Sequence, residues 1–367
     1  MCTRMTKRQL TVALLMMGTL STLSLVFSVK IVFGKGLLRE TAETKGIMVG
    51  TLLDRSALNN AMFRTTIANE FTAGIAIVFM RDTQPQPGHF DFREMDAVIQ
   101  FASENKIKLA GHALIYRLTN PAWLNFGMFS CGGWSKDALD QVLKTHIQTI
   151  VSYGGNYFYV WDVVNEPLTP DGEIGRSCWY KVLGEDYIAN AFRYAHAANP
   201  QVLLRLNETF GRGGIDAQKA DAFFALIRKL KSQGVPVHVA GIQMHLEAPR
   251  LRPTYLQEFR DFLTKAMEIG VQVHITEMDV YQGVPGTFVQ PFETQKAVYK
   301  AVLSTCLEFS HCTSFATWGL VDKFSWLKTR KQDTYPDASP LLFDDNCSPK
   351  PAYFGVVEAI EERQDGQ

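Results

Sequence analysis

The chain has 367 residues, of which 46% are hydrophobic and 20% are charged, and its 37 basic residues balance its 37 acidic ones. A chain of this length can bury a large hydrophobic core. Its zero net charge and its lack of a Lys/Arg run argue against nucleic acid as a partner, because phosphate binding requires a clustered basic surface.

The first structural signal along the chain is an uncharged hydrophobic segment. Residues 9–29 carry no charge, and Arg4, Lys7 and Arg8 precede them. This order is typical of a secretory signal peptide or a signal-anchor whose positive end stays inside the cell. A buried helix of the folded domain is the alternative interpretation. We expect residues 1–35 to direct the chain out of the cytoplasm, as a secreted protein or one anchored in the membrane.

Short apolar runs alternate with amphipathic stretches through the rest of the chain. Eight runs have the length and composition of strands, namely Gly46–Leu53, Ala73–Phe79, Ile107–Ile115, Tyr157–Val164, Val202–Asn207, Val237–Met244, Val271–Thr276 and Ser314–Leu320. Six stretches between them have apolar residues at helical spacing, namely Phe92–Asn105, Lys136–Tyr153, Glu185–Asn199, Asp216–Gln233, Thr254–Ile269 and Glu293–Ser310. The strands are nearly continuous apolar runs, which suits parallel strands covered by helices.

Eight strand–helix units within residues 46–362 predict a (β/α)₈ TIM barrel of the α/β class, as one catalytic domain. An open doubly wound sheet is the alternative. That fold would call for a glycine-rich phosphate-binding turn after an early strand, and the sequence has none. Since the active site of a barrel lies at the carboxyl ends of its strands, we expect functional residues directly after the apolar runs.

Two glutamates lie at corresponding strand ends. Glu166 follows the fourth strand in WDVVNEPL, and Glu277 follows the seventh in HITEMD. Either one alone could be a solvated loop carboxylate. Two carboxylates facing each other across a barrel mouth are typical of glycoside hydrolysis, in which one protonates the leaving oxygen and the other attacks the anomeric carbon. Polar and aromatic residues near the other strand ends support this interpretation, because aromatic faces pack against sugar rings.

Six segments, in order from about Gly46 to Ile360, resemble family 10 of the glycoside hydrolases, the endo-β-1,4-xylanase family. They are GHALIYRLTNPAWL, VWDVVNEPL, GIQMHL, VHITEMDV, ATWGLVDKFSWL and PLLFDDNCSPKPAY. The resemblance implies a retaining hydrolase that acts on a β-linked glycan without a cofactor, and we expect a monomer. No CxxC motif or Cys/His spacing suggests zinc, so we also expect no metal.

The resemblance assigns roles to individual residues. Glu166 matches the family's acid/base and Glu277 its nucleophile. Asn165 matches the residue that binds the 2-hydroxyl of the reacting sugar. His245 matches a histidine bonded to the nucleophile, with Asp279 behind it. The resemblance also implies further residues around the sugar, namely His112, Gln243, Trp318 and Trp326.

Two of these residues have structural alternatives, since Trp318 could pack in the core and His112 could be a buried histidine with satisfied hydrogen bonds. Two functional alternatives also stay open. The chain could be a pseudoenzyme that binds glycans without cleaving them, or a transglycosylase of the same fold.

The sequence departs from the family pattern after the second strand. With Pro85 and Phe90–Phe92 as anchors, residues 75–80 read Ile-Ala-Ile-Val-Phe-Met where the family has Glu-Asn-x-x-Lys-Trp. These polar groups hold hydroxyls of sugars on the non-reducing side in the family. A hydroxyl buried without a partner costs about 1–3 kcal/mol. We therefore predict that this protein is a poor xylanase.

Two further departures lie after the third and fifth strands. Tyr116 and Arg117 replace the family's Trp-His, and Asn-Glu-Thr-Phe at residues 207–210 replaces Asn-Asp/Glu-Tyr-Asn. The guanidinium of Arg117 suits a carboxylate, which favours an acidic or otherwise decorated sugar. The alternative is that Arg117 only pairs with a neighbouring acid.

The chain has six cysteines. An oxidising compartment would allow two pairs, Cys306 with Cys312 and Cys131 with Cys178. Free thiols in a cytosolic protein are the alternative. The resemblance supports the first pair, because part of the family has a disulfide at this spacing.

Overall fold

The computed structural model describes residues 35–127, 130–283, 292–331, 334–335 and 337–363. The predicted signal or anchor segment lies outside these residues, apart from its last position. Among the residues described, no helix has the length and apolar character needed to cross a membrane.

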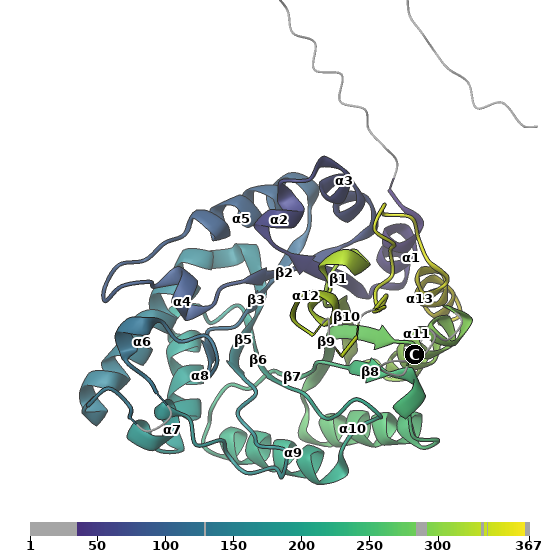
Figure 1. Ribbon diagram of the computed structural model, residues 1–367. Helices are drawn as coiled ribbons and strands as arrows, with labels where there is room; N and C mark the ends of the chain where they lie inside the picture. The colour runs from purple at the N-terminus through teal and green to yellow at the C-terminus, as the bar shows by residue number, and fades with distance from the viewer. Residues whose placement is uncertain (1–34, 128–129, 284–291, 332–333, 336, 364–367) are drawn as a thin grey trace, which may run out of the picture. The chain divides into compact units, whose positions relative to one another are not determined.

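Eight parallel strands close into a barrel (Figure 1), which confirms the predicted fold. Each strand pairs with the next around the ring, and β10 pairs with both β9 and β1. The strands are β1 (Met48–Leu53), β2 (Ala73–Ile77), β3 (Lys108–His112), β5 (Phe158–Asn165), β6 (Leu203–Glu208), β7 (Val239–Ile242), β9 (Gln272–Tyr281) and β10 (Cys312–Thr317).

Two short strands extend the sheet at the carboxyl end of the barrel. They are β4 (Ile115–Tyr116), which pairs with β5, and β8 (His245–Glu247), which pairs with β9. The prediction of one strand over Ile107–Ile115 is therefore wrong in detail, because the strand ends at His112 and resumes as β4. This break brings Tyr116 beside Asn165 at the end of β5.

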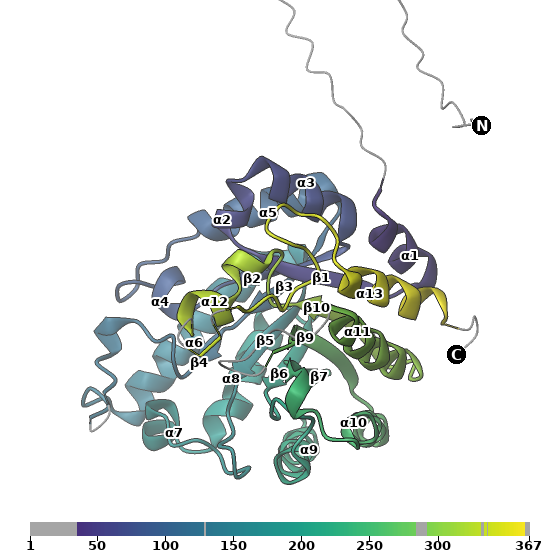
Figure 2. The ribbon, with the colours of Figure 1, turned by 45° about the vertical axis from the view of Figure 1, so that its right-hand side comes forward.

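Helices surround the barrel (Figures 1 and 2), and the six predicted ones are all present. They are α5 (Arg93–Asn105), α6 (Lys136–Gly154), α8 (Asp186–Ala198), α9 (Ala217–Ser232), α10 (Tyr255–Ile269) and α11 (Phe292–Leu307). Helix α9 shows how the sequence sets their orientation. Its start is capped by Asp216, and its buried residues Phe223, Ile227 and Leu230 recur at helical spacing.

The remaining helices were not predicted from the sequence. They are α1 (Leu37–Lys45), α2 (Arg55–Leu58), α3 (Ala61–Glu70), α4 (Met80–Thr83), α7 (Cys178–Leu183), α12 (Trp326–Arg330) and α13 (Pro351–Glu361). Helices α1 and α13 lie side by side (Figures 1 and 2). The backbone N–H of Leu38 donates to the Tyr353 hydroxyl at 3.0 Å, and that hydroxyl donates to Glu70 at 2.7 Å. Residues near the two ends of the described chain thus stabilise each other.

A buried ion pair lies inside the barrel. The guanidinium of Arg205 donates to both carboxylate oxygens of Asp162, at 2.5 and 2.9 Å. Burial opposes the charge of Asp162, but Arg205 and the bonded His112 outweigh this and lower the pKa of Asp162 to about 2. Asp162 therefore stays ionised and fixes the His112 ring from below the active site.

Both predicted cysteine pairs are disulfides in the structure. Cys131 bonds to Cys178 at the start of α7, and Cys306 in α11 bonds to Cys312 in β10. Cys347 is a free thiol.

Candidate active site

The two predicted catalytic glutamates lie at the carboxyl end of the barrel. Glu166 directly follows β5, and Glu277 is the sixth residue of β9. Glu166 has a left-handed backbone conformation, with φ of 49°, which is uncommon for a residue other than glycine. Its backbone N–H donates to the carbonyl of Asn207 at 2.9 Å. This bond to the neighbouring strand holds the turn that presents the Glu166 side chain.

Glu166 accepts hydrogen bonds from two side chains. The Tyr116 hydroxyl donates to Oε2 at 3.0 Å, and Gln243 Nε2 donates to Oε1 at 3.1 Å. Burial and the charge of Glu166 raise the pKa of Tyr116, so its hydroxyl remains a donor over the physiological range. Arg117 Nη2 lies 3.7 Å from Oε2, which is too long for a hydrogen bond. The Glu166 side chain is 19% exposed.

Glu277 is more deeply buried, with only 5% of its side chain exposed. Asn207 Nδ2 lies 2.8 Å from Oε1, and His245 Nε2 lies 3.3 Å from Oε2. Nδ1 of His112 is 3.8 Å from Oε1. The carboxyl group of Glu277 is therefore surrounded by side-chain nitrogen atoms from three residues.

One hydrogen-bond network connects the two carboxyl groups. Its centre is the Asn165 side-chain oxygen, which accepts from Asn207 at 2.9 Å and from Gln243 at 3.4 Å. Asn207 also donates to Glu277, and Gln243 also donates to Glu166. The two glutamates are thus positioned relative to each other by the same three amides.

His245 carries a positive charge beside Glu277. Its Nδ1 lies 2.9 Å from Asp279 Oδ2, which also accepts from the indole of Trp326 at 2.7 Å. Burial lowers the pKa of His245, but the charge of Asp279 and the bonds to Asp279 and Glu277 outweigh this and raise the pKa to about 10. A protonated His245 therefore donates to both carboxylates at neutral pH.

His112 is 2% exposed, and its Nδ1 lies 2.8 Å from Asp162. Burial lowers the pKa of His112, but the charges of Glu277 and Asp162 outweigh this and raise it. The ring packs edge-on against Trp318, with centroids 5.1 Å apart, and against Phe79 at 5.6 Å. The geometry is that of a buried histidine with a satisfied hydrogen bond, and its predicted role in sugar binding stays a prediction.

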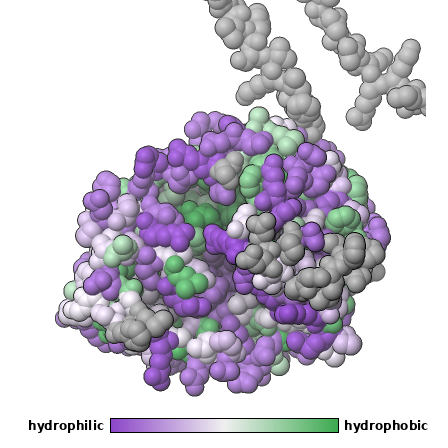
Figure 3. All heavy atoms as spheres, viewed as in Figure 1, coloured by the Kyte–Doolittle hydropathy of each residue, from purple (hydrophilic) through white to green (hydrophobic). Residues whose placement is uncertain are grey.

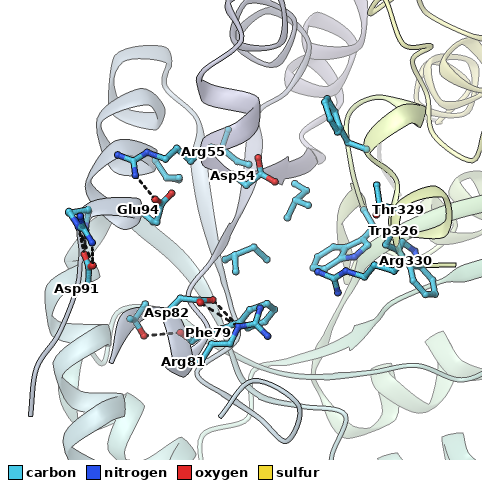
Figure 4. Close-up of a pocket in the computed structure, with 18 residues that line it drawn as sticks. Asp54, Arg55, Phe79, Arg81, Asp82, Asp91, Glu94, Trp326, Thr329 and Arg330 are labelled. Atoms are coloured by element: carbon cyan, nitrogen blue, oxygen red, sulfur yellow. Dashed lines mark hydrogen bonds and ion pairs between the residues drawn. The ribbon is translucent and has the colours of Figure 1, made fainter. Parts of the chain in front are cut away.

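A cavity of about 480 Å³ lies beside the catalytic residues, and we call it the β2 cavity. Figure 4 shows Phe79 and Arg81, from the segment after β2, on one side and Trp326, Thr329 and Arg330 on the other. Its apolar lining includes Leu53, Ile77, Phe79 and Val98. On this face of the molecule, Figure 3 shows an apolar patch in a hollow surrounded by hydrophilic residues.

Most of the charged groups around the β2 cavity are paired with each other. Ion pairs join Arg55 to Glu94 at 2.8 Å, Arg93 to Asp91 at 2.5 Å and Arg81 to Asp82 at 3.3 Å. The Arg81 guanidinium also lies over the Phe79 ring, 5.1 Å from its centroid.

The segment after β2 forms part of the wall of this cavity. Ile75 and Ala76 are only 3% and 1% exposed and do not line the β2 cavity. Strand β2 continues to Ile77, and the residues of this segment that line the cavity are Ile77, Phe79, Arg81, Asp82 and Thr83. Ile77 and Phe79, which we call the floor of the cavity, are apolar, whereas Arg81, Asp82 and Thr83 add polar groups beside them.

The structure brings most of the predicted site residues together. The interlinked ones are Asn165, Glu166, Gln243, His245, Glu277 and Asp279. Trp318 and Trp326 are partly exposed and line the β2 cavity, so they are not core residues. Arg117 lies at the edge of the site with 47% of its side chain exposed.

Two residues that contact the glutamates were not among the predicted site residues. Asn207 bonds to Glu277, and Tyr116 bonds to Glu166. Both lie near strand ends, so the rule that places active sites there could have found them.

The comparisons with known proteins agree with this arrangement. The model of glycosyl hydrolase family 10 matches residues 37–359. An endo-1,4-beta-xylanase B of Thermotoga neapolitana is 32% identical over 76% of this chain and 77% of its own length. An endo-1,4-beta-xylanase of Agaricus bisporus is 31% identical over 84% of this chain and 90% of its own.

Solved structures show the same likeness. Xylanase 10B from Thermotoga petrophila RKU-1, in complex with xylobiose, superimposes with a TM-score of 0.80 at 29% identity, over 89% of this chain and 97% of that one. A family model that spans so much of the chain, together with the two glutamates at the strand ends, shows that the chain belongs to glycosyl hydrolase family 10 and is a glycoside hydrolase.

Proposed function

We propose that the protein hydrolyses a β-1,4-linked, xylan-type glycan with retention of configuration at the anomeric carbon. The observation that carries the proposal is the network in which Asn165, Asn207 and Gln243 connect Glu166 to Glu277. The names of the relatives, endo-1,4-beta-xylanases, support a xylan-type substrate.

The reaction requires two displacements. In the first, a carboxylate oxygen of Glu277 attacks the anomeric carbon while Glu166 gives its proton to the departing glycosidic oxygen. In the second, Glu166 removes a proton from water, and the water oxygen displaces Glu277 from the sugar. The free sugar keeps its original configuration, and both glutamates return to their starting states.

The surroundings of the two glutamates support this division of roles. Glu277 lies beside the protonated His245 and the Asn207 amide, which favour an ionised nucleophile. Among the described residues, no cation lies within hydrogen-bond distance of Glu166, and its side chain is more exposed than that of Glu277, which allows it to exchange protons with water.

The proposed site of action is outside the cytoplasm, as a secreted or membrane-anchored enzyme. The charge pattern of residues 1–35 supports this location. The pairs Cys131–Cys178 and Cys306–Cys312 also support it, because disulfides persist in oxidising compartments.

The test is to follow hydrolysis of β-1,4-xylo-oligosaccharides by proton NMR and to identify the anomer that forms first. We expect the β-anomer to appear before mutarotation produces the α-anomer. An α-anomer formed first would contradict a retaining mechanism. No hydrolysis across a broad panel of β-glycans would instead favour a protein that only binds glycans.

A further inference from the structure

A second cavity lies next to Glu166 and is lined by three cations. It has a volume of about 880 Å³, and we call it the cationic cavity. Arg117, Arg176 and Lys181 line it, and no aspartate or glutamate belongs to its lining among the residues described. Arg117 comes from the segment after β4, Arg176 from the loop after β5 and Lys181 from α7.

These three cations have hydrogen-bond donors that are available to a ligand. Neither Arg176 nor Lys181 forms an ion pair within the described part of the chain, and both are exposed. Within the part of the chain that the structure describes, Arg117 pairs with Glu166 alone, and at 3.7 Å that contact uses none of its hydrogen-bond donors. This differs from the β2 cavity, where three of the four lining arginines are each paired with a carboxylate of the same lining, Arg330 being the exception among the described residues.

The cavity is part of a fixed scaffold. Cys178, which lines it, is bonded to Cys131. The side-chain oxygen of Asn120, another lining residue, accepts from the Trp179 indole at 2.9 Å, and its amide donates to the Arg117 carbonyl at 3.0 Å. These bonds connect the segment after β4 to α7, so that Arg117 and Lys181 are presented by elements tied to each other.

The position of the cavity indicates which part of a substrate would reach it. Arg117 connects it to Glu166, and Leu168 of its lining follows Glu166 by two residues. Glu166 is the group proposed to protonate the departing oxygen, so the adjoining cavity faces the leaving-group side of the glycan. This step rests on the proposed function.

We propose that the cationic cavity binds a carboxylate-bearing substituent, such as a uronic acid, on the leaving-group side of the glycan. Guanidinium forks and ammonium groups suit a carboxylate, and the absence of acids in the lining removes competition for them. A neutral, undecorated glycan has no charged group to offer these cations, so they would contact only water.

The test measures binding of two β-1,4-xylo-oligosaccharides of equal length, one neutral and one with a single uronic acid on its leaving-group half. Calorimetry on Glu277→Gln, which cannot turn over, is done at low and high salt. We expect about tenfold tighter binding of the acidic compound at low salt and a smaller ratio at high salt. Equal affinities at low salt would overturn the proposal.

Two double variants in the Glu277→Gln background assign the effect to the cavity. Arg176→Gln with Lys181→Gln should lower the ratio of affinities most of the way to one, since Arg117 alone is then left to bind the carboxylate. Lys136→Gln with Arg228→Gln changes the net charge equally at exposed helix positions outside both cavities, and should keep the ratio. An unchanged ratio in the first variant, or an equal loss in the second, would overturn the proposal. Hydrolysis of the same oligosaccharides by the wild type is measured in parallel. Absence of hydrolysis would count against the proposed function, whereas the ratio of binding affinities decides this inference.

Discussion

The network around the two glutamates and the floor of the β2 cavity are neighbouring regions that differ in polarity. Side chains of the network form hydrogen bonds with one another, whereas the floor is apolar. In the network, Asn165, Asn207 and Gln243 each donate to or accept from a neighbouring side chain. In the cavity floor, Ile77 and Phe79 offer no side-chain donor or acceptor. The Phe79 ring lies 5.6 Å from that of His112, so the two regions meet directly.

This difference suggests that catalysis and substrate selection depend on separate residues. Removing one member of a buried network leaves its partners unsatisfied, at a cost of about 1–3 kcal/mol for each group. The network residues therefore constrain one another. A side chain in the cavity floor can change without that cost, so the substrate contacts can diverge while the catalytic arrangement is kept.

The largest effect is expected from Glu277→Ala. Loss of the nucleophile should lower turnover by about 10⁴-fold or more. External azide should restore activity by attacking from the vacated side, and the product should then have inverted configuration. The measurement is turnover of an activated aryl glycoside with and without azide, with the wild type as the control. Activity close to that of the wild type without azide would contradict the assignment.

Glu166→Ala should have a smaller effect that depends on the leaving group. General acid catalysis contributes roughly 10²–10⁴-fold, and only a poor leaving group requires the proton. We expect a loss of about 10³-fold on oligosaccharides and a much smaller loss on aryl glycosides with acidic phenols. The comparison is made by measuring kcat/KM for both substrate types. Equal losses would show that Glu166 does not protonate the leaving oxygen.

Much of the fold could be predicted from the sequence. Continuous apolar runs alternating with helical spacing indicate parallel strands covered by helices, and all eight barrel strands follow from that pattern. The short strands β4 and β8 could not be predicted in this way. They consist of two and three residues, Ile115–Tyr116 and His245–Glu247, too few to show a period.

The catalytic pair could be predicted because strand ends in a barrel converge, but its hydrogen bonds could not. Asn207 and Gln243 meet at the Asn165 oxygen although they come from distant parts of the chain. Sequence spacing carries no information on such contacts. Sequence patterns likewise could not show which residues after β2 reach the cavity, where Ile77 and Phe79 line it while Ile75 and Ala76 are buried.

The charge of His245 gives a test of the network through stability. The pKa of His245 is raised from 6.5 to about 10 in the folded state, so the folded protein binds this proton more tightly than the unfolded chain. The resulting stabilisation is fully present below pH 6.5 and is lost as pH rises through about 10. We expect His245→Gln to be less stable than the wild type by a few kcal/mol at pH 6, with the difference shrinking toward pH 10.

The measurement is urea unfolding of both proteins at several pH values between 6 and 10. His89→Gln is a suitable control, because His89 is exposed and lies outside the network. The difference in free energy of unfolding between His89→Gln and the wild type should be small and should not shrink toward pH 10. A stability difference for His245→Gln that stays constant or grows with pH would contradict a protonated His245.

The smallest effect is expected at the β2 cavity itself. Adding one xylose on the non-reducing side of a xylo-oligosaccharide should raise kcat/KM by less than about tenfold, because Ile77 and Phe79 can form no side-chain hydrogen bond with its hydroxyls and Arg81 is already paired with Asp82. Phe79→Ala should leave this ratio nearly unchanged, since no hydrogen bond to a sugar hydroxyl is lost. The measurement is kcat/KM for oligosaccharides of increasing length, with bond-cleavage positions identified by isotopic labelling of the reducing end. A gain of 10²-fold or more for each added sugar would show that the cavity binds plain xylan well. It would contradict the conclusion that catalysis and substrate selection depend on separate residues.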